Sequence, residues 1–326
     1  MHKKSIINVI GLILVFLGFS MQFSVIVAGI YGEGDLIPIL KSSIITIAFG
    51  GSLVLLTHKK KTEIAVRDGF AIVTLGWVFM AVFSALPFYI SGAIPTYTDS
   101  FFEAMSGLTT TGASILGHVS TNQIENLPHG VLFWRSFTHF IGGMGIIVFS
   151  IAMLPLLGMG GVQLFKAEVA GPTADKLTPR VKQTAKYLWG IYVGFVVLLT
   201  GILWIEGMTF FDAICHSFGT MATGGFSTKN GSIGQYQSPL IEYTIILFMF
   251  ISATNFTLHY LSLTNKKNLY FKDSEFKFYL GVVGFFTFAI GLNIAINNYG
   301  FGFDAFRHGL FTSVSLISST GFATEN

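Results

Sequence analysis

The chain has 326 residues, of which 52% are hydrophobic and only 11% are charged, and its mean hydropathy is +0.67. A soluble domain usually carries about a quarter charged residues, so this composition excludes an ordinary soluble protein and indicates many membrane spans. The net charge of +3 is too small to indicate a nucleic acid partner, and the single cysteine, Cys215, excludes an intramolecular disulfide.

Seven segments are long and apolar enough to cross a bilayer, which takes about 20 residues. In chain order the predicted spans are Ile6–Ile30, Leu36–Thr57, Phe70–Ile90, Val131–Leu157, Tyr187–Ile205, Leu240–Leu263 and Phe278–Ile296. The first apolar run is longer than that of a cleaved signal peptide, so we expect it to be a retained membrane helix. The sequence therefore predicts an all-α integral membrane protein that is surrounded by membrane lipid.

The basic residues are distributed unevenly between alternate connections. The N-terminus and the connections at 58–67, 166–186 and 266–277 hold 15 of the 19 lysines and arginines, whereas the opposite connections hold mostly acids. Basic residues favour the cytoplasmic side of a membrane. We therefore expect a multi-pass protein of the cytoplasmic (inner) membrane with its N-terminus in the cytoplasm.

Three connections on the predicted outer side are too long and too apolar to be ordinary loops. Each contains an aspartate, then a run of small and apolar residues, then a Thr-Gly step, and the three steps are Thr111-Gly112, Thr223-Gly224 and Thr320-Gly321. The steps recur at a period of roughly one hundred residues, which indicates an internal repeat of span, short segment, Thr-Gly and span.

The short segments before these steps are predicted to be re-entrant pore half-helices. A helix of their length covers only about 15–20 Å, which is half of a bilayer. Asp99, Asp212 and Asp304 are predicted to cap the outer ends of the three half-helices, so that the negative ends of the helix dipoles point inward. The backbone that follows each half-helix must then line an aqueous cavity, and this arrangement favours a cation there.

Glycine permits backbone angles that aim successive carbonyl groups toward one axis, and rings of carbonyl oxygens can replace the hydration shell of potassium. We therefore predict that potassium is the transported ion and that no organic cofactor is bound. The predicted selectivity filter consists of Thr110-Thr111-Gly112, Ala222-Thr223-Gly224 and Ser319-Thr320-Gly321.

Other classes of function stay open at this point. An ion-coupled secondary solute transporter would also have broken helices, although its ion sites would lie near the bilayer midplane. An intramembrane enzyme would need paired catalytic groups or metal ligands on the spans, and the sequence contains neither, so we expect no enzymatic activity. A non-conducting, truncated remnant is the third alternative.

Several charged and polar residues lie in apolar surroundings. Arg135 and Arg307 are interpreted as membrane anchors or as ion pairs that join pore units, with an electrostatic role near the ion path as the alternative. His139 is predicted to be a packing residue and His216 to support the filter by hydrogen bonding. The glycine cluster at 142–145 is predicted to allow close helix packing.

Four stretches resemble a known family, the Trk-type potassium transporter membrane subunits of the TrkH/KtrB superfamily. They are residues 102–112, 134–145, 217–227 and 318–324, and the resemblance covers essentially the whole chain. It implies potassium uptake through four pore-loop units, gated and regulated from the cytoplasm. It also implies a homodimer and a cytoplasmic, nucleotide-binding regulatory subunit that forms a ring.

Compared with that family, the sequence is expected to be C-terminally incomplete, because it ends five residues after Gly321. We therefore predict four parts. They are an N-terminal two-helix unit at 1–64, a first pore-loop repeat at 65–165, a second repeat at 166–270 and an incomplete third repeat at 271–326.

Overall fold

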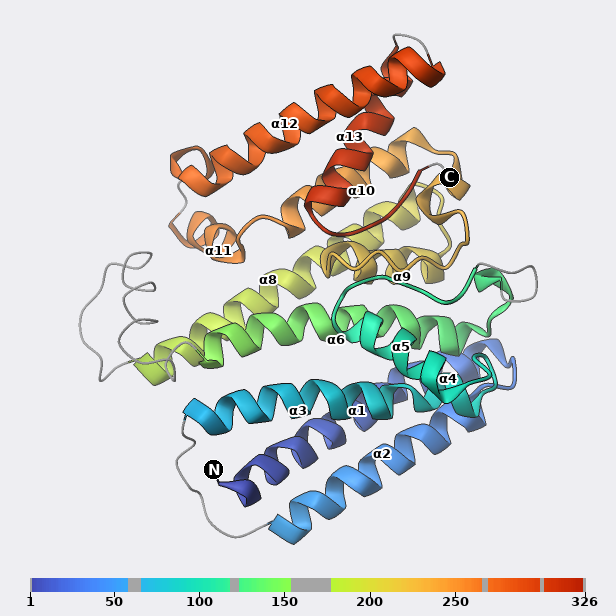
Figure 1. The fold of residues 1–326 in the computed structure, drawn as a ribbon, viewed down its shortest axis with the longest axis vertical. Helices are drawn as coiled ribbons and strands as arrows, with labels where there is room; N and C mark the ends of the chain where they lie inside the picture. Colours follow the sequence, from blue (N-terminus) through green and yellow to red (C-terminus); the bar gives the residue numbers. More distant parts are fainter. Residues whose placement is uncertain are drawn as a thin grey trace.

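The structure is a computed structural model that describes residues 2–57, 66–117, 123–153, 177–265, 269–299 and 302–324. Within these ranges the chain is helical and contains no β-strand, which confirms the predicted all-α fold. The helices are arranged along the long axis of the molecule, with the α1–α2 pair at one end, α6 and α8 in the middle, and α12 at the other end (Figure 1).

Helices α1 (Lys3–Tyr31) and α2 (Leu36–Thr57) pack against each other as a hairpin. The two backbones come close at Gly11 and Gly50, because a Cβ atom added to either glycine would lie 2.8 Å from the carbonyl oxygen of the other. Small residues allow this separation, as is usual where helices associate in lipid.

Two series of elements follow in which a short helix lies between longer ones. The first comprises α3 (Val66–Ser84), α4 (Leu86–Ile90), α5 (Tyr97–Leu108), η1 (Ile124–Asn126) and α6 (His129–Met153). The second comprises α8 (Leu177–Ile205), α9 (Phe210–Met221), η3 (Ser232–Tyr236), α10 (Pro239–Ser252) and α11 (Phe256–Asn265). A third series begins with η4 (Tyr270–Lys272), α12 (Ser274–Ile294), η5 (Ala295–Tyr299) and α13 (Phe303–Ile317).

Five helices of the described chain are long and apolar enough to cross a membrane, or six if the bent pair α10 and α11 is one span. The predicted count of seven spans is therefore not confirmed. Helix α6, which overlaps the predicted span Val131–Leu157, is not among these five, and residues 154–157 lie outside the described ranges.

The predicted span Leu240–Leu263 is not one continuous helix, because α10 and α11 meet at 90°. Polar side chains explain the break. The hydroxyl of Thr254 donates to the carbonyl of Phe250, and the side-chain oxygen of Asn255 accepts from the backbone N–H of Thr257 and so starts a new helix.

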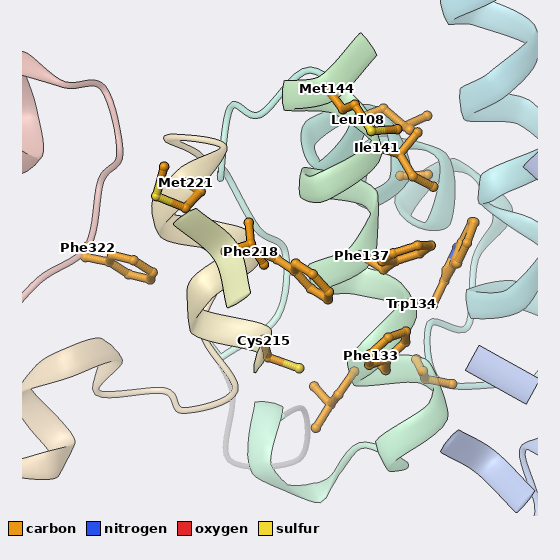
Figure 2. Packing of buried hydrophobic residues seen from close by; sticks show 14 of the residues in the cluster. Leu108, Phe133, Trp134, Phe137, Ile141, Met144, Cys215, Phe218, Met221 and Phe322 are labelled. Atoms are coloured by element: carbon orange, nitrogen blue, oxygen red, sulfur yellow. The ribbon is translucent and has the colours of Figure 1, made fainter. Parts of the chain in front are cut away.

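The apolar core between the first and second series is formed by α6 and α9. Figure 2 shows Phe133 and Phe137 of α6 beside Phe218 of α9, and the ring centroids of Phe218 and these two residues are 5.9 and 5.5 Å apart. Trp134 is fully buried and donates its indole N–H to the carbonyl of Ser84 at 3.0 Å, where α3 ends. Helix α6 is therefore held on two sides, and this fixes its position beside the pore loops.

Candidate ion pathway: three convergent pore loops

The three short helices α5, α9 and α13 correspond to the predicted half-helices, but the aspartates do not cap them. Thr96 and Thr209 are the N-cap residues of α5 and α9, and their hydroxyls accept from the N–H groups of Asp99 and Asp212 at 3.1 and 3.0 Å. Because a threonine hydroxyl can accept this bond, the carboxylate is left within the first turn, where it still interacts with the helix dipole.

The third half-helix differs at its start. The N-cap of α13 is Gly302, which has no side chain, and Asp304 lies in the first turn. Helix α13 has 15 residues, whereas α5 and α9 have 12 each. Asp304 is therefore not at the position of Asp99 and Asp212, and sequence spacing alone does not align the third acid.

All three half-helices end in the same turn. The backbone N–H of Thr111, Gly224 and Thr320 donates to the carbonyl five residues earlier, at 2.9, 2.8 and 2.9 Å. The preceding residues, Thr110, Thr223 and Ser319, have φ angles of +54°, +52° and +57°. This is the Schellman ending, in which glycine usually occupies the left-handed position.

A left-handed conformation in a threonine is energetically unfavourable, because its β-branched side chain crowds the backbone. The same unfavourable conformation occurs at the end of each half-helix, at Thr110, Thr223 and Ser319. Such residues persist only where the surrounding structure holds them, and they cluster at functional sites.

The turns also correct the register that the sequence suggested. The glycines with positive φ that follow are Gly112, Gly225 and Gly321, at +74°, +75° and +81°. Gly225, and not Gly224, is therefore the structural equivalent of Gly112 and Gly321. The predicted match of Thr223-Gly224 to the other two Thr-Gly steps is wrong by one residue, because the turn geometry places Gly224 where the other loops have threonine.

The three loops contact one another in chain order. A methyl group at Gly112 would overlap the carbonyl oxygen of Gly224, and one at Gly225 would overlap the carbonyl oxygen of Thr320. Because Gly224 and Thr320 occupy equivalent positions, the same contact is made twice. For a Cβ atom added to Gly321, no other described part of the chain lies within 4 Å. The structure thus brings the predicted filter residues of all three loops together.

Helix α6 lies between the first two loops. A Cβ atom at Gly142 would overlap the carbonyl of Leu108 at the end of α5, and one at Gly143 would lie 3.0 Å from the Cα of Ala222. The prediction that this glycine cluster allows close packing is confirmed for these two residues.

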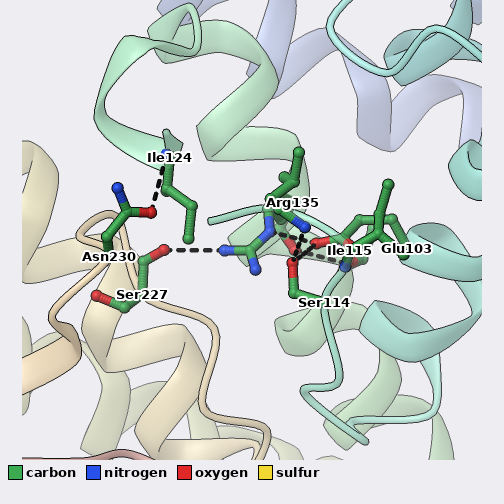
Figure 3. A network of polar contacts seen from close by, with 9 residues as sticks. Glu103, Ser114, Ile115, Ile124, Arg135, Ser227 and Asn230 are labelled. Carbon is green, nitrogen blue, oxygen red and sulfur yellow. Dashed lines mark hydrogen bonds and ion pairs between the residues drawn. The ribbon is translucent and has the colours of Figure 1, made fainter. Parts of the chain in front are cut away.

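A buried ion pair joins α5 to α6 within the first series, and its arginine reaches the second loop through a hydrogen bond. Arg135 of α6 is 2% exposed and Glu103 of α5 is 0% exposed, and Arg135 Nε lies 2.6 Å from Glu103 Oε1. Glu103 also accepts from the hydroxyl of Ser114 at 2.8 Å, and Arg135 Nη1 donates to the carbonyl of Ser227 at 2.8 Å (Figure 3). Arg135 therefore forms an ion pair, as interpreted, but the pair lies within the first unit, and a hydrogen bond to the carbonyl of Ser227 makes the contact with the second unit. Glu103 was not predicted as its partner.

The second loop contains a similar buried side-chain contact behind its turn, made by hydrogen bonds. His216 of α9 has its two ring nitrogens 2.9 Å from the hydroxyl of Ser227 and 2.7 Å from the carbonyl of Asp212. Along the sequence, His216 and Ser227 are separated from Gly225 by the same numbers of residues as Glu103 and Ser114 are from Gly112. The predicted supporting role of His216 is therefore confirmed.

The second and third loops are joined by backbone groups and by ion pairs at the half-helix start. The N–H of Gly234 donates to the carbonyl of Ala323 at 3.1 Å, and the N–H of Ala323 donates to the hydroxyl of Ser232 at 3.2 Å. Arg307 of α13 lies 2.8 Å from Glu242 of α10 and 2.6 Å from Asp304. Arg307 therefore also joins two elements through an ion pair.

Two acids from the connection between α1 and α2 cap the start of α6. Glu33 accepts from the N–H of His129 at 2.6 Å, and Asp35 accepts from the N–H of Val131 at 3.0 Å. Partial burial opposes the ionisation of Glu33, but the hydrogen bonds from His129 outweigh it and lower the pKa of Glu33. Burial dominates at Asp35 and raises the pKa of its carboxyl group.

The described residues contain no group of three or more His, Cys, Asp or Glu side chains that could hold a metal ion. What gathers at the ends of the half-helices is instead backbone carbonyl and hydroxyl oxygen. Hard monovalent cations prefer oxygen ligands of this kind, and the negative ends of three helix dipoles point to the same region.

The chain matches the family model of TrkH, described as cation transport protein, over residues 37–324. This chain belongs to the TrkH family. It is similar to the Trk system potassium uptake protein TrkH of Escherichia coli strain K12, with 40% identity over 332 residues, 100% of this chain and 67% of the relative. The TrkH protein of Vibrio parahaemolyticus is 39% identical over 330 residues, covering 99% of this chain and 67% of the relative.

The crystal structure of the potassium transporter TrkH from Vibrio parahaemolyticus matches this structure with a TM-score of 0.87 and 36% sequence identity, over 99% of this chain and 66% of that chain. The chain therefore spans about two thirds of the length of its relatives. The predicted resemblance to Trk-type membrane subunits is confirmed, and TrkH proteins are transporters and not enzymes.

Proposed function

We propose that this chain takes up potassium ions across a membrane, through a pathway lined by the backbone carbonyl groups of its three pore loops. The observation that carries this proposal is the repeated left-handed turn at the ends of α5, α9 and α13, with Gly112 against the carbonyl of Gly224 and Gly225 against that of Thr320. The relatives that share this sequence are named potassium uptake proteins.

The chemistry of the turns supports the choice of ion. An ion that enters a narrow pathway must exchange its water for protein oxygens, and carbonyl groups held at a fixed separation do this best for one ionic size. The filter stretches that we propose contain Thr110, Thr111, Gly112, Ala222, Thr223, Gly224, Ser319, Thr320 and Gly321. We include Gly225 as well, because its positive φ matches that of Gly112 and Gly321. Since the three stretches differ in side chain, the ring is asymmetric.

We further propose the cytoplasmic membrane as the location, with a cytoplasmic N-terminus, because basic residues gather on one side of the spans. A homodimer and a cytoplasmic nucleotide-binding regulatory subunit are the partners expected from the family resemblance. The division into units at 1–64, 65–165, 166–270 and 271–326 is retained as part of this proposal.

The proposal is tested by potassium uptake in a bacterium that lacks its own uptake systems and expresses this chain at verified levels in the membrane. Gly112→Asp is the test variant, because its side chain would overlap the carbonyl of Gly224 and place a charge among the filter carbonyls. Gly32→Asp is the matched control, since Gly32 also has positive φ (+68°) but has open space around it.

The expected result is growth at low potassium with the unsubstituted chain and with Gly32→Asp, and no growth with Gly112→Asp. Absence of uptake by the inserted, unsubstituted chain would contradict the proposed function of this chain. Equal uptake by Gly112→Asp would contradict the assignment of the first loop to the ion pathway.

A further inference from the structure

The imidazole of His139 is buried against the second loop without a hydrogen bond. The side chain is 0% exposed, and neither ring nitrogen has a partner among the residues that the structure describes. The ring stacks on Phe226 with 4.1 Å between centroids, while the guanidinium carbon of Arg135 lies 3.7 Å from the centroid of the same ring. Two groups this close cannot share one face, so Phe226 lies between Arg135 and His139.

His139 also determines which residue can stand at position 224. A Cβ atom added to Gly224 would lie 2.6–2.7 Å from three atoms of the His139 ring, which places it over the ring face. Gly224 is not among the residues with positive φ, so its backbone would accept a side chain. Glycine at this position is therefore required by the imidazole and not by the conformation of the turn.

The other two loops have a threonine at this position. The hydroxyl of Thr111 lies 2.8 Å from that of Thr109, and the hydroxyl of Thr320 lies 2.8 Å from that of Ser318. The second loop has Ala222 and Gly224 at the two corresponding positions, so it has no such hydroxyl pair.

The three turns share their hydrogen bonds and their positive-φ positions, so a side chain at position 224 would point as Thr111 and Thr320 do. The space that it would enter is the space of the His139 ring. A phenylalanine or leucine would fill this space without leaving polar atoms unsatisfied, so packing alone does not explain an imidazole here.

We propose that His139 is a specificity-determining positioning residue of the ion pathway. From α6, its imidazole replaces the threonine side chain and hydroxyl pair of the other loops, and it holds the peptide of Gly224 so that its carbonyl stays against Gly112. This inference rests on the proposed function, because the property that His139 sets is the preference of the second loop for potassium.

The test removes the imidazole of His139 and adds a threonine side chain at position 224, separately and together. Gly224→Thr, His139→Ala and the double variant are compared with the unsubstituted chain by thermal unfolding of the purified proteins in potassium. The same variants are compared by rubidium uptake in competition with potassium or sodium. The matched control is Gly225→Ala with and without His139→Ala. A methyl group at Gly225 would overlap the carbonyl of Thr320 and would be strained by the positive φ of this residue, but it would not contact His139.

Gly224→Thr is expected to lower the unfolding midpoint by about 4 °C or more and uptake by about ten-fold, because it overfills the space of the ring. His139→Ala alone is expected to weaken the preference for potassium over sodium. The double variant is expected to recover the midpoint, the uptake and the preference together, whereas His139→Ala does not rescue Gly225→Ala.

Failure of the double variant to recover the midpoint of Gly224→Thr would overturn the inference, as would an unchanged ion preference in His139→Ala. Rescue of Gly225→Ala by His139→Ala would also overturn it, because the effect would then be general loosening of the loops. Absence of uptake by the unsubstituted chain would instead contradict the proposed function, and the unfolding midpoints would still decide whether His139 and a residue 224 side chain compete for one space.

Discussion

Beside the turns, the boundary between the first and second pore loops and the boundary between the second and third are held by different chemistry. At the first boundary, the side chains of Arg135 and Glu103 form a buried ion pair that reaches the carbonyl of Ser227. At the second, backbone groups pair directly beside the turns, with the N–H of Gly234 on the carbonyl of Ala323, and the ion pair of Arg307 with Glu242 lies at the start of α13. Both boundaries bring a positive-φ glycine against the carbonyl of the next loop.

The comparison shows that one backbone geometry can be supported in two ways. A side-chain ion pair depends on both partners, because the removal of one leaves an uncompensated charge in a buried place. A backbone pair survives most side-chain changes and is sensitive mainly to steric intrusion. The contacts beside the turns at the first boundary should therefore be more fragile toward substitution than those beside the turns at the second.

The largest effect is expected from Arg135→Leu, which leaves the fully buried carboxylate of Glu103 without its positively charged partner. Removal of one member of a buried pair costs about 3–5 kcal/mol. The unfolding midpoint of the purified protein measures this loss. The double variant Arg135→Leu with Glu103→Gln should recover part of it, and a double variant less stable than Arg135→Leu would contradict the ion-pair account of this boundary.

The next largest effect is expected from Gly234→Ala at the second boundary, where the added methyl would overlap the carbonyl of Thr324. Overfilling of this kind costs about 1–3 kcal/mol. Gly231→Ala is the control, since its Cβ atom would meet Gln235 no closer than 3.3 Å. Similar unfolding midpoints for the two variants would show that the contact of η3 with the third loop does not hold the boundary.

A smaller effect is expected from Ser232→Ala, which removes the hydroxyl that accepts from the N–H of Ala323 at 3.2 Å. A single hydrogen bond contributes about 0.5–1.5 kcal/mol, and the backbone bond of Gly234 remains. The unfolding midpoint should therefore fall less than in Gly234→Ala. A loss as large as that of Arg135→Leu would contradict the backbone character of the contacts between η3 and the third loop.

The smallest effect concerns the N-terminal end of α6, the helix that contacts both sides of the first boundary. The pKa of Glu33 is lowered from its ordinary value of 4.5, so its contribution to stability is present above that pH and is lost as pH falls through the folded-state pKa. Glu33→Gln should therefore lower the unfolding midpoint near neutral pH and have little effect in acid. A difference that grows as pH falls would contradict this sign.

Much of this arrangement was predictable from the sequence because periodic and compositional signals are local. The half-helices, Gly112 and Gly321 follow from apolar segments that are too short to cross a bilayer, and His216 follows from its place within one of them. The partner of Arg135 was not predictable, since Glu103 is 32 residues away in sequence and only the packing of α5 against α6 brings them together.

The register of the second loop could not be predicted either. Thr223-Gly224 matches the other Thr-Gly steps in letters, but the hydrogen bond from Gly224 to the carbonyl of Gly219 shows where the turn lies. The threonine caps were missed for a related reason, because Thr96 and Thr209 precede the more conspicuous acids by three residues. The break between α10 and α11 was also missed, because only Thr254 and Asn255 mark it within an apolar run.

The most direct test of the ring of carbonyls is ion flux in vesicles that contain the purified chain, measured separately for potassium, rubidium and sodium. The predicted result is that potassium and rubidium pass at least about ten-fold faster than sodium, and that Gly225→Ala abolishes this difference or all flux. Equal flux of sodium and potassium through the unsubstituted chain, or full discrimination in Gly225→Ala, would contradict a selectivity filter built from these three turns.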